Sequence, residues 1–403
     1  MEKNNNKYKR ADRNFKHMCL LLSILIVLVL WGCEYQSETV TSDISTPEKG
    51  PICNQELSDG TLENNDNTNN GDVGKIDEDL NPYDFILTFA GDINFDENWF
   101  TMKYYNMVEN GIHDCISPEL IQIMQDADIM CINNEFTYST GGAPINNKAY
   151  TFRAHPSRVN ILKELGVDIV TLANNHVYDY GEQSLIDTMA TLKQADILYY
   201  GAGHNLDEAM TPVYFEIDGK TIAYVAASRA EKNKMTPQAT EDSPGILHCY
   251  DTALFIQTIK EAKEKSDYVI AYVHWGTEFT YELEDVQLTT GKEYLDAGAD
   301  IVIGAHPHCL QGIEYYDGKP IIYSLGNFWF NGQTIDTMLL KIHFYGDKTE
   351  EFIELEVVPA LQTNNTTKII TEQLEKERIY SLLEDISINA EIDDLGIIAE
   401  ISH

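Results

Sequence analysis

The sequence predicts an α/β protein in which a layered sheet core is covered by helices. Apolar runs of strand length, rich in Val, Ile and Ala, alternate along the chain with helical patterns at 157–165, 182–195 and 252–265. Continuous apolar strands separated by helices are typical of sheets with both faces covered. Hydrophobic residues make up 43% of the 403 residues. A chain of this size and composition can bury a large core without disulfide support.

The first 33 residues are predicted to form a signal peptide. Six basic side chains lie within residues 2–17, and an uncharged apolar run fills residues 18–31, as in a secretory signal. The run is shorter than the ~20 residues of a membrane span, and it ends in LWGC, which resembles a bacterial lipobox with Cys33 as the lipidated residue. Cleavage before Cys33, an uncleaved anchor and simple secretion remain open. All three place the body at the extracytoplasmic face of the cell membrane.

Three segments are predicted after the signal peptide. Residues 34–82 combine many acidic, amide and hydroxyl side chains with almost no aliphatic ones, so they cannot bury enough surface to fold. We interpret them as a disordered acidic linker that tethers the body to the membrane. The body follows at 83–360. The pattern TEQLEKERIYSLLEDI predicts a helical extension at 361–403.

Five of the predicted buried strands end in residue types that bind metal ions. Ligands of α/β sheets bind at the carboxyl ends of strands, so these distant segments are expected to converge on one site. Asp, Glu, Asn and His without Cys suit a divalent cation such as Mn, Fe, Zn or Mg. The five strand ends are Gly91-Asp92, Asn133-Asn134-Glu135, Asn174-Asn175-His176, His274-Trp275-Gly276 and His306-Pro307-His308.

The His306-Pro307-His308 segment adds a geometric argument. Pro307 biases His306 toward an extended backbone. In an extended segment, residues two apart project to the same side. Both imidazoles are therefore expected to face one ion or one substrate.

Composition narrows the possible partners and sites. Lys and Arg total 28 against 65 Asp and Glu, a formal charge of −37, which would repel a phosphate backbone. Nucleic acid is therefore excluded as a general partner. The seven cysteines contain no CxxC pair, which excludes a zinc knuckle and favours buried free thiols.

Several motifs together resemble the CapA family, also called PgsA, of capsule-synthesis proteins associated with poly-γ-glutamate. The resemblance spans about residues 85 to 330 and implies a domain similar to the calcineurin-like metallophosphatases. The motifs, in the family's order, are AGDINF (90–95), NNE (133–135), TFRAHP (151–156), TLANNHVYDYG (171–181), GAGHNLDEA (201–209), VHWGTEF (273–279) and GAHPHCLQGIEYYDGKPIIYSLGNF (304–328).

The resemblance implies a ligand set for one or two divalent ions. It contains two acids, of which Glu135 resembles a replacement for the bridging aspartate, together with an amide and three imidazoles. Asn94 stands where the metallophosphatase pattern has a histidine, which leaves the second ion open. The implied ligands are Asp92, Glu135, Asn175, His274, His306 and His308.

Four further residues complete the predicted site. His176 resembles the substrate-facing general acid, and Asp179 its orienting partner. Arg153 could hold a carboxylate or phosphate through a two-pronged contact. Asn327, which follows another strand, is predicted to contribute to substrate binding or to support its neighbours by hydrogen bonding.

The resemblance implies metal-assisted attack at a phosphorus or acyl centre, by a phosphatase-like, polymer-hydrolase or transferase site. The expected substrate is an anionic cell-envelope polymer such as poly-γ-glutamate or its phosphorylated carrier, and the expected partners are other capsule synthesis and export subunits. Two alternatives remain open. One is a non-catalytic polymer-binding or assembly subunit of a capsule export complex, and the other is a general phosphoesterase.

Overall fold

The computed structural model describes residues 82–230 and 235–401. The predicted signal peptide with Cys33 lies outside these residues, as does the predicted linker except for its last residue, Pro82. No helix within the described ranges has both the length and the apolar character needed to cross a membrane. The four cysteines in these ranges are buried and free, as predicted: Cys115, Cys131, Cys249 and Cys309.

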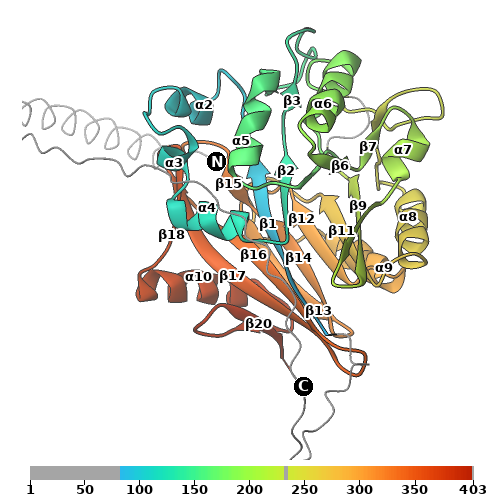
Figure 1. Ribbon diagram of the computed structural model, residues 1–403, viewed down its shortest axis with the longest axis vertical. Coiled ribbons are helices and arrows are strands. Elements are labelled where there is room, and N and C mark those ends of the chain that lie inside the picture. The colour runs from blue at the N-terminus through green and yellow to red at the C-terminus, as the bar shows by residue number, and fades with distance from the viewer. Residues whose placement is uncertain (1–81, 231–234, 402–403) are drawn as a thin grey trace, which may run out of the picture. The chain divides into compact units, whose positions relative to one another are not determined.

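Two sheets form the centre of the body (Figure 1). The larger sheet has the strand order β19-β20-β17-β16-β1-β2-β5-β6, with β15 beside β1 and β18 beside β17. Its strands are β1 (Tyr83–Ile93), β2 (Ile129–Asn134), β5 (Ile169–Thr171), β6 (Leu198–Tyr200), β15 (Asn327–Trp329), β16 (Ile335–Gly346), β17 (Glu351–Thr363), β18 (Thr366–Ile369), β19 (Ala390–Ile392) and β20 (Ile397–Glu400).

The smaller central sheet has the strand order β13-β14-β12-β11-β9-β8. Its strands are β8 (Val213–Ile217), β9 (Lys220–Ser228), β11 (Tyr268–His274), β12 (Ile301–Ala305), β13 (Leu310–Tyr316) and β14 (Lys319–Leu325). Two short pairs complete the strands, β3 (Thr137–Tyr138) with β4 (Arg153–Ala154), and β7 (Ala202–Gly203) with β10 (Gly245–Ile246).

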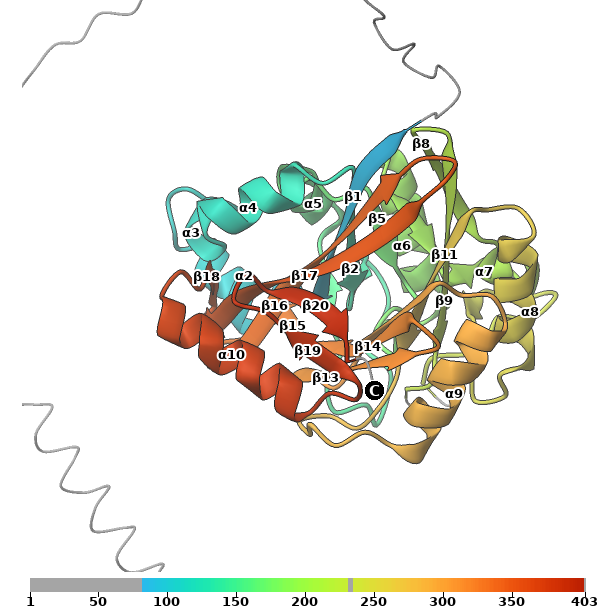
Figure 2. The ribbon, with the colours of Figure 1, turned by 90° about the horizontal axis from the view of Figure 1, so that it is seen from below.

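Helices cover the outer faces of both sheets, so the layers run helix, sheet, sheet, helix (Figure 2). The predicted helices at 157–165, 182–195 and 252–265 are confirmed as α5, preceded by a short 3-10 turn, α6 and α8. The helices are α2 (Phe100–Tyr105), α3 (Ile112–Cys115), α4 (Pro118–Gln125), α5 (Val159–Glu164), α6 (Glu182–Gln194), α7 (Leu206–Met210), α8 (Ala253–Lys263), α9 (Asp285–Asp296) and α10 (Gln373–Asp385).

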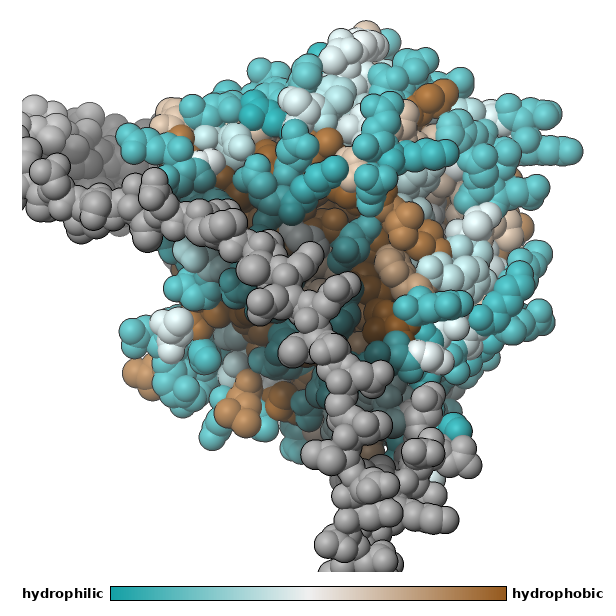
Figure 3. Space-filling view, in the orientation of Figure 1, coloured by the Kyte–Doolittle hydropathy of each residue, from teal (hydrophilic) through white to brown (hydrophobic). Residues whose placement is uncertain are grey.

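The alternation of side chains along β1 explains why the two sheets pack face to face. Phe85, Leu87 and Phe89 belong to a buried cluster that also contains Tyr224 and Ile270 of the smaller sheet. The face of the larger sheet that points away from the smaller sheet packs against α4, α5 and α6. The outer face of the smaller sheet packs against α8 and α9. The outward surfaces over α6, α7 and α8 are mostly hydrophilic (Figure 3). The predicted α/β architecture with a helix-covered sheet core is thus confirmed.

The C-terminal segment is part of this body. Strand β17 crosses residue 360, and Leu355 of β17 pairs with Ile398 of β20. The predicted helix exists as α10, and it buries Ile379 and Leu383 in the cluster between the sheets. Residues 361–401 therefore extend the larger sheet in addition to forming a helix. The strands β19 and β20 have three and four residues, too few for a period-two pattern to stand out.

The carboxyl ends of the parallel strands in both sheets meet in one region, around Gly91 and Gly326. Strands β1, β2, β5 and β6 are mutually parallel, and so are β9, β11, β12 and β14. Two glycines allow the backbones to meet there. A Cβ on Gly91 would lie 1.9 Å from the carbonyl oxygen of Gly326, and Gly326 itself has a φ of 68°. Only glycine fits both requirements, and the amide of Asp92 donates to that same carbonyl at 2.9 Å.

Candidate metal centre

The structure brings the six predicted metal ligands together in one buried cluster. Each lies at the end of a strand or shortly after it, and the strands come from both sheets. This confirms the convergence expected from the strand ends. By element, the residues are Asp92 of β1, Glu135 after β2, Asn175 after β5, His274 of β11, and His306 and His308 after β12; all are buried.

Glu135 lies at the centre of this cluster. Its Oε1 is 3.7 Å from Nε2 of His274 and 3.9 Å from Nε2 of His308. Ligand atoms that share an ion through bonds of ~2 Å lie roughly 3 to 4 Å apart. Two overlapping groups have ligand atoms within 4.8 Å of one another, Glu135 with His306 and His308, and Glu135 with Asp92 and His274. Glu135 is common to both, as a bridging carboxylate would be.

The imidazoles and amides of the cluster hold one another in place. Nε2 of His274 lies 2.8 Å from Oδ1 of Asn175 and 3.1 Å from Nδ1 of His306. The side-chain amide of Asn133 donates to Asp92 at 2.7 Å and lies 3.3 Å from Nδ1 of His274. Asn133 therefore orients an acid and an imidazole at once.

The histidine pair converges by a backbone route different from the predicted one. His306 has a φ of 97° and His308 a φ of 57°, so the segment is not extended around Pro307. The two rings still face the same cluster, with centroids 5.9 Å apart. The prediction of convergence was right, and the extended-backbone argument for it was wrong. Positive φ at a non-glycine residue costs about 1 kcal/mol or more, and the packing around the cluster overrides the preference of a residue before proline.

The electrostatics of the cluster fit a bound cation. Burial, followed by repulsion from Asp92, raises the pKa of Glu135 well above its ordinary value. Burial and the neighbouring histidines lower the pKa of His274 well below its ordinary value and that of His306 to about 3. Within the described chain, Oε1 of Glu135 is buried without a hydrogen-bond partner. Burial lowers the pKa of His308, but the hydrogen bond and charge of Asp92, 3.2 Å from its Nδ1, raise this pKa overall. A divalent ion would supply further counter-charge to the two buried acids.

His176 lies beside the cluster and is held by hydrogen bonding to Asp179. Its Nδ1 lies 2.7 Å from Oδ2 of Asp179, and its Nε2 lies 3.9 Å from Oε1 of Glu135. The carboxylate of Asp179 accepts a hydrogen bond from Nδ1–H, which leaves Nε2 facing the site. Nζ of Lys148 lies 2.9 Å from Oδ1 of Asp179, with only 2% of its side chain exposed, and also donates to the carbonyl of Asn175.

The two predicted substrate-binding residues, Arg153 and Asn327, do not line the cavity beside His176. Arg153 does not line the cavity beside His176, because its guanidinium donates to the carbonyl of Gly141 at 2.8 Å and lies 4.1 Å above the ring of Tyr180. Asn327 is buried, with its Oδ1 2.8 Å from Nδ1 of His308. Asn327 therefore supports an imidazole and is not among the residues that line the cavity beside His176.

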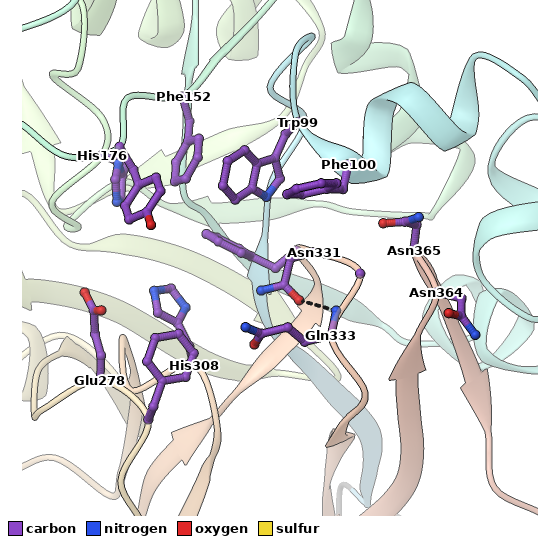
Figure 4. A pocket seen from close by; sticks show the side chains of 14 residues that line it. Trp99, Phe100, Phe152, His176, Glu278, His308, Asn331, Gln333, Asn364 and Asn365 are labelled. Atoms are coloured by element: carbon purple, nitrogen blue, oxygen red, sulfur yellow. Dashed lines mark hydrogen bonds between the residues drawn. The ribbon is translucent and has the colours of Figure 1, made fainter. Parts of the chain in front are cut away.

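A cavity of about 660 Å³ opens next to His176 and His308 (Figure 4). Its walls are aromatic on one side and rich in carboxamides on the other. Besides the two histidines, the lining consists of Trp99, Phe100, Tyr150, Phe152, Glu278, Phe279, Phe330, Asn331, Gly332, Gln333, Asn364 and Asn365.

Sequence reasoning missed most of the cavity-lining residues, and it also missed Lys148 and Asn133, which support the metal ligands and His176. Lys148 and Tyr150 lie between β3 and β4 in a polar loop without a motif, and Asn364 and Asn365 lie in the hairpin turn between β17 and β18. Asn133 was within a recognised motif but had no assigned role. Its position two residues before Glu135, at the end of a strand, was the one available signal.

Comparison with known families identifies one match. The sequence model described as "Bacterial capsule synthesis protein PGA_cap" matches residues 86–332, more than half of the chain. The matched range contains all ten residues predicted for the metal, the catalytic proton and the substrate.

Two curated relatives share about a third of their aligned residues with this chain. "PGA biosynthesis protein CapA" of Bacillus subtilis (strain 168) is 32% identical over 263 residues, which cover 64% of this chain and 68% of the relative. "Capsule biosynthesis protein CapA" of Bacillus anthracis is 35% identical over 236 residues, which cover 57% of this chain and 56% of the relative. The chain thus spans little more than half of the second relative.

Distant matches are found among solved structures. The crystal structure of a hypothetical protein from Thermus thermophilus aligns with a TM-score of 0.38 and 15% identity, covering 66% of this chain and 99% of that one. A likeness at this level supports no conclusion about the site.

Proposed function

The chain belongs to the CapA (PgsA) family of bacterial capsule synthesis proteins, and from this premise we propose that it is a membrane-tethered, metal-dependent hydrolase or transferase of capsule biosynthesis. The proposed substrates are a poly-γ-glutamate-like polymer or its phosphorylated carrier. One observation carries the enzymatic part of the proposal. Oε1 of Glu135 is buried without a hydrogen-bond partner in the described chain, among imidazole nitrogens at 3.7 to 3.9 Å.

The donor set supports one or two divalent ions. Asp92, Glu135, His274, His306 and His308 would provide charged and imidazole ligands, and Asn175 an amide oxygen. A metal bound there would polarise the reacting oxygen and supply hydroxide at neutral pH. We also propose that the sheet core is of the calcineurin-like metallophosphatase type.

The residues beside the ligands have separable tasks in this mechanism. His176 faces the cavity through Nε2, where a proton can pass to the leaving group. Asp179 fixes the tautomer of His176, and Lys148 balances the charge of Asp179. The ring of Phe152, with its centroid 4.5 Å from that of His176, restricts water on one side of the imidazole.

The location of the protein is also a proposal. The basic and apolar segments of residues 1–33 support export, and Cys33 at the end of LWGC supports lipid attachment. The acidic composition of residues 34–82 supports a tether between that anchor and the body. The expected partners are other subunits of capsule synthesis and export.

A second candidate function is a non-catalytic polymer-binding or assembly subunit. Asn94 favours it, because the side chain at this metallophosphatase histidine position accepts a hydrogen bond from the amide of Asp96 at 2.8 Å and does not contribute an imidazole. A site with one ligand fewer could still hold an ion and a polymer without turnover.

The two functions are separated by a paired experiment on the full-length chain. Elemental analysis measures bound metal, and nitrophenyl phosphate mono- and diesters measure turnover. For the enzyme, we expect stoichiometric metal and a turnover that His176→Ala abolishes without loss of metal. Absence of metal from folded protein would refute the metal-dependent enzyme. Bound metal, combined with capsule production that His176→Ala leaves unchanged, would establish the assembly role.

A further inference from the structure

The cavity beside His176 has a lining that differs from what an anionic polymer requires. Of its fourteen lining residues none is Lys or Arg, and Glu278 is the one acid. The nearby cations face other groups. Arg153 contacts Gly141 and Tyr180, and Lys148 is paired with Asp179. A chain with one carboxylate per unit would therefore enter a cavity without a Lys or Arg side chain, on a protein of formal charge −37.

Aromatic rings form a continuous path from the metal centre to the cavity mouth. The ring centroids of His308 and Phe330 are 4.7 Å apart, and Phe330 and Phe152 follow at 5.5 Å. Trp99 lies 5.0 Å from Phe152 and 5.0 Å from Phe100. The path leads outward on one side of the cavity, as Figure 4 shows for Phe152, Trp99 and Phe100. Ring faces of this kind pack against flat, weakly polar surfaces.

The mouth of the cavity exposes three large aromatic side chains. Phe100 is 55% exposed, Tyr150 60% and Phe279 57%. Exposed aromatic residues grouped around one cavity indicate a binding surface more than a packing defect. A ligand that covers these rings would remove their apolar area from water.

The opposite wall supplies neutral hydrogen-bonding groups. Asn331, Gln333, Asn364 and Asn365 all line it, and a carboxamide both donates and accepts. Oδ1 of Asn331 already accepts from the side-chain amide of Gln362 and the backbone amide of Gln333, each at 2.9 Å, so Asn331 has only its amide hydrogens to offer. Asn364 and Asn365 have φ values of 51° and 66°, which also suit their hairpin turn. Gln333 has no such backbone requirement and is exposed at this wall, and Oδ1 of Asn365 is buried without a hydrogen-bond partner in the described chain.

These observations point to a ligand with an uncharged, hydroxylated ring and one anionic end. We propose that the cavity binds a sugar unit whose phosphate reaches the metal centre near His176 and His308. The apolar face of the sugar would lie on the aromatic wall, and its hydroxyl groups would meet the carboxamides. The inference rests on the proposed function only for the position of the phosphate. It selects the phosphorylated carrier over the glutamate polymer as the group bound here.

Binding measurements on the full-length, metal-loaded chain test this inference without any turnover. Calorimetry would compare glucose 1-phosphate with inorganic phosphate, a γ-linked glutamate pentamer, adenosine monophosphate and decyl phosphate. We expect glucose 1-phosphate to bind at least about tenfold more tightly than inorganic phosphate, and more tightly than the other three probes. Stacking on one ring accounts for about two- to tenfold of such a preference.

Variants at the cavity mouth locate the preference. Phe100→Ala and Tyr150→Ala should each lower the glucose 1-phosphate affinity about fivefold, with the inorganic phosphate affinity unchanged. Phe352→Ala is the matched control, because Phe352 is an exposed aromatic residue (45%) that does not line the cavity. It should leave both affinities as they are.

Each contrary outcome has a distinct meaning. Tighter binding of the glutamate pentamer, the nucleotide or decyl phosphate would overturn the sugar assignment, as would mouth variants that leave the preference intact. If glucose 1-phosphate shows its preference but no phosphoester is ever turned over, the proposed enzyme fails while the ligand class stands. If phosphoesters are turned over without a sugar preference, the inference fails alone.

Discussion

The inner and outer parts of the site are built on opposite physical principles. The inner part, around Glu135, is fully buried, concentrates two acids and several imidazoles, and takes its residues from the ends of buried strands. The outer part, around Phe100, is half-exposed, almost without charge, and takes its residues mostly from loops and a hairpin turn. The inner part is suited to holding charge in a fixed geometry, and the outer part to selecting a shape.

The largest effect is expected from removing the charge at the centre of the inner part. Glu135→Gln should weaken metal binding more than about 100-fold. Loss of a residue that only supports a ligand lowers metal affinity by about 10- to 100-fold, and this change removes a charged ligand itself. Chelation should lower the unfolding midpoint of the unaltered protein, because an ion that binds the folded state stabilises it. In Glu135→Gln, elemental analysis should find little metal, and the chelator should leave the midpoint unchanged.

The metal-free form of this variant gives a second check. The buried Glu135 carboxylate costs free energy when no cation compensates it, as its raised pKa indicates. Metal-free Glu135→Gln should therefore be at least as stable as the metal-free unaltered chain in urea unfolding. A clear loss of stability would contradict this, and would mean that protein contacts such as the amide of Asn133, 3.3 Å from Oε2 of Glu135, stabilise the carboxylate without a cation.

The next effect concerns the proton-transfer group between the two parts. His176→Ala should reduce kcat by about 10² to 10⁴, with metal content unchanged, in a nitrophenyl phosphodiester assay. His155 is exposed and its Nδ1 lies 2.8 Å from the hydroxyl of Ser157, so His155→Ala is the control and should keep full activity. Equal losses in both variants would remove His176 from the proposed role.

The buried ion pair behind His176 should affect stability. Lys148→Met leaves Asp179 without its buried cation, and breaking such a pair costs about 3 to 5 kcal/mol of unfolding free energy. The pair of Lys341 with Glu356 is partly exposed, so Lys341→Met should cost less than about 1 kcal/mol. Denaturant titrations of the two variants measure the difference. Equal values would show that burial does not strengthen the inner pair.

The smallest expected effect is on polymer affinity, when a charge is introduced into the uncharged wall of the outer part. Gln333→Lys introduces a cation into an uncharged wall. It should raise the affinity for a γ-linked glutamate pentamer by about two- to fivefold, since a partly exposed ion pair is worth up to ~1 kcal/mol. Gln333→Met is the uncharged control and should give no gain. If the lysine has no effect on the pentamer, charge does not limit polymer binding at this wall.

The same contrast explains which features could be predicted from sequence. The inner ligands follow buried strands, and parallel strand ends meet by topology, so Asp92, Glu135 and His274 could be placed from strand patterns alone. The cavity residues depend on how loops fold back, and Tyr150 and Asn365 carry no periodic signal. Arg153 was assigned by residue type, and its contact with Tyr180 could not be foreseen. The positive φ of His306 likewise reflects tertiary packing against a local preference.

The pairing of β1 with β16 governs when the site can exist during synthesis. Ala90, two residues before Asp92, pairs with Leu339, almost 250 positions later. As the chain emerges from its amino end, the first ligand strand must wait for the last third of the polypeptide before its sheet is complete. Contacts so distant in sequence form slowly, and a fragment released early would lack them. Chemical competence is thus tied to synthesis of the chain through β16.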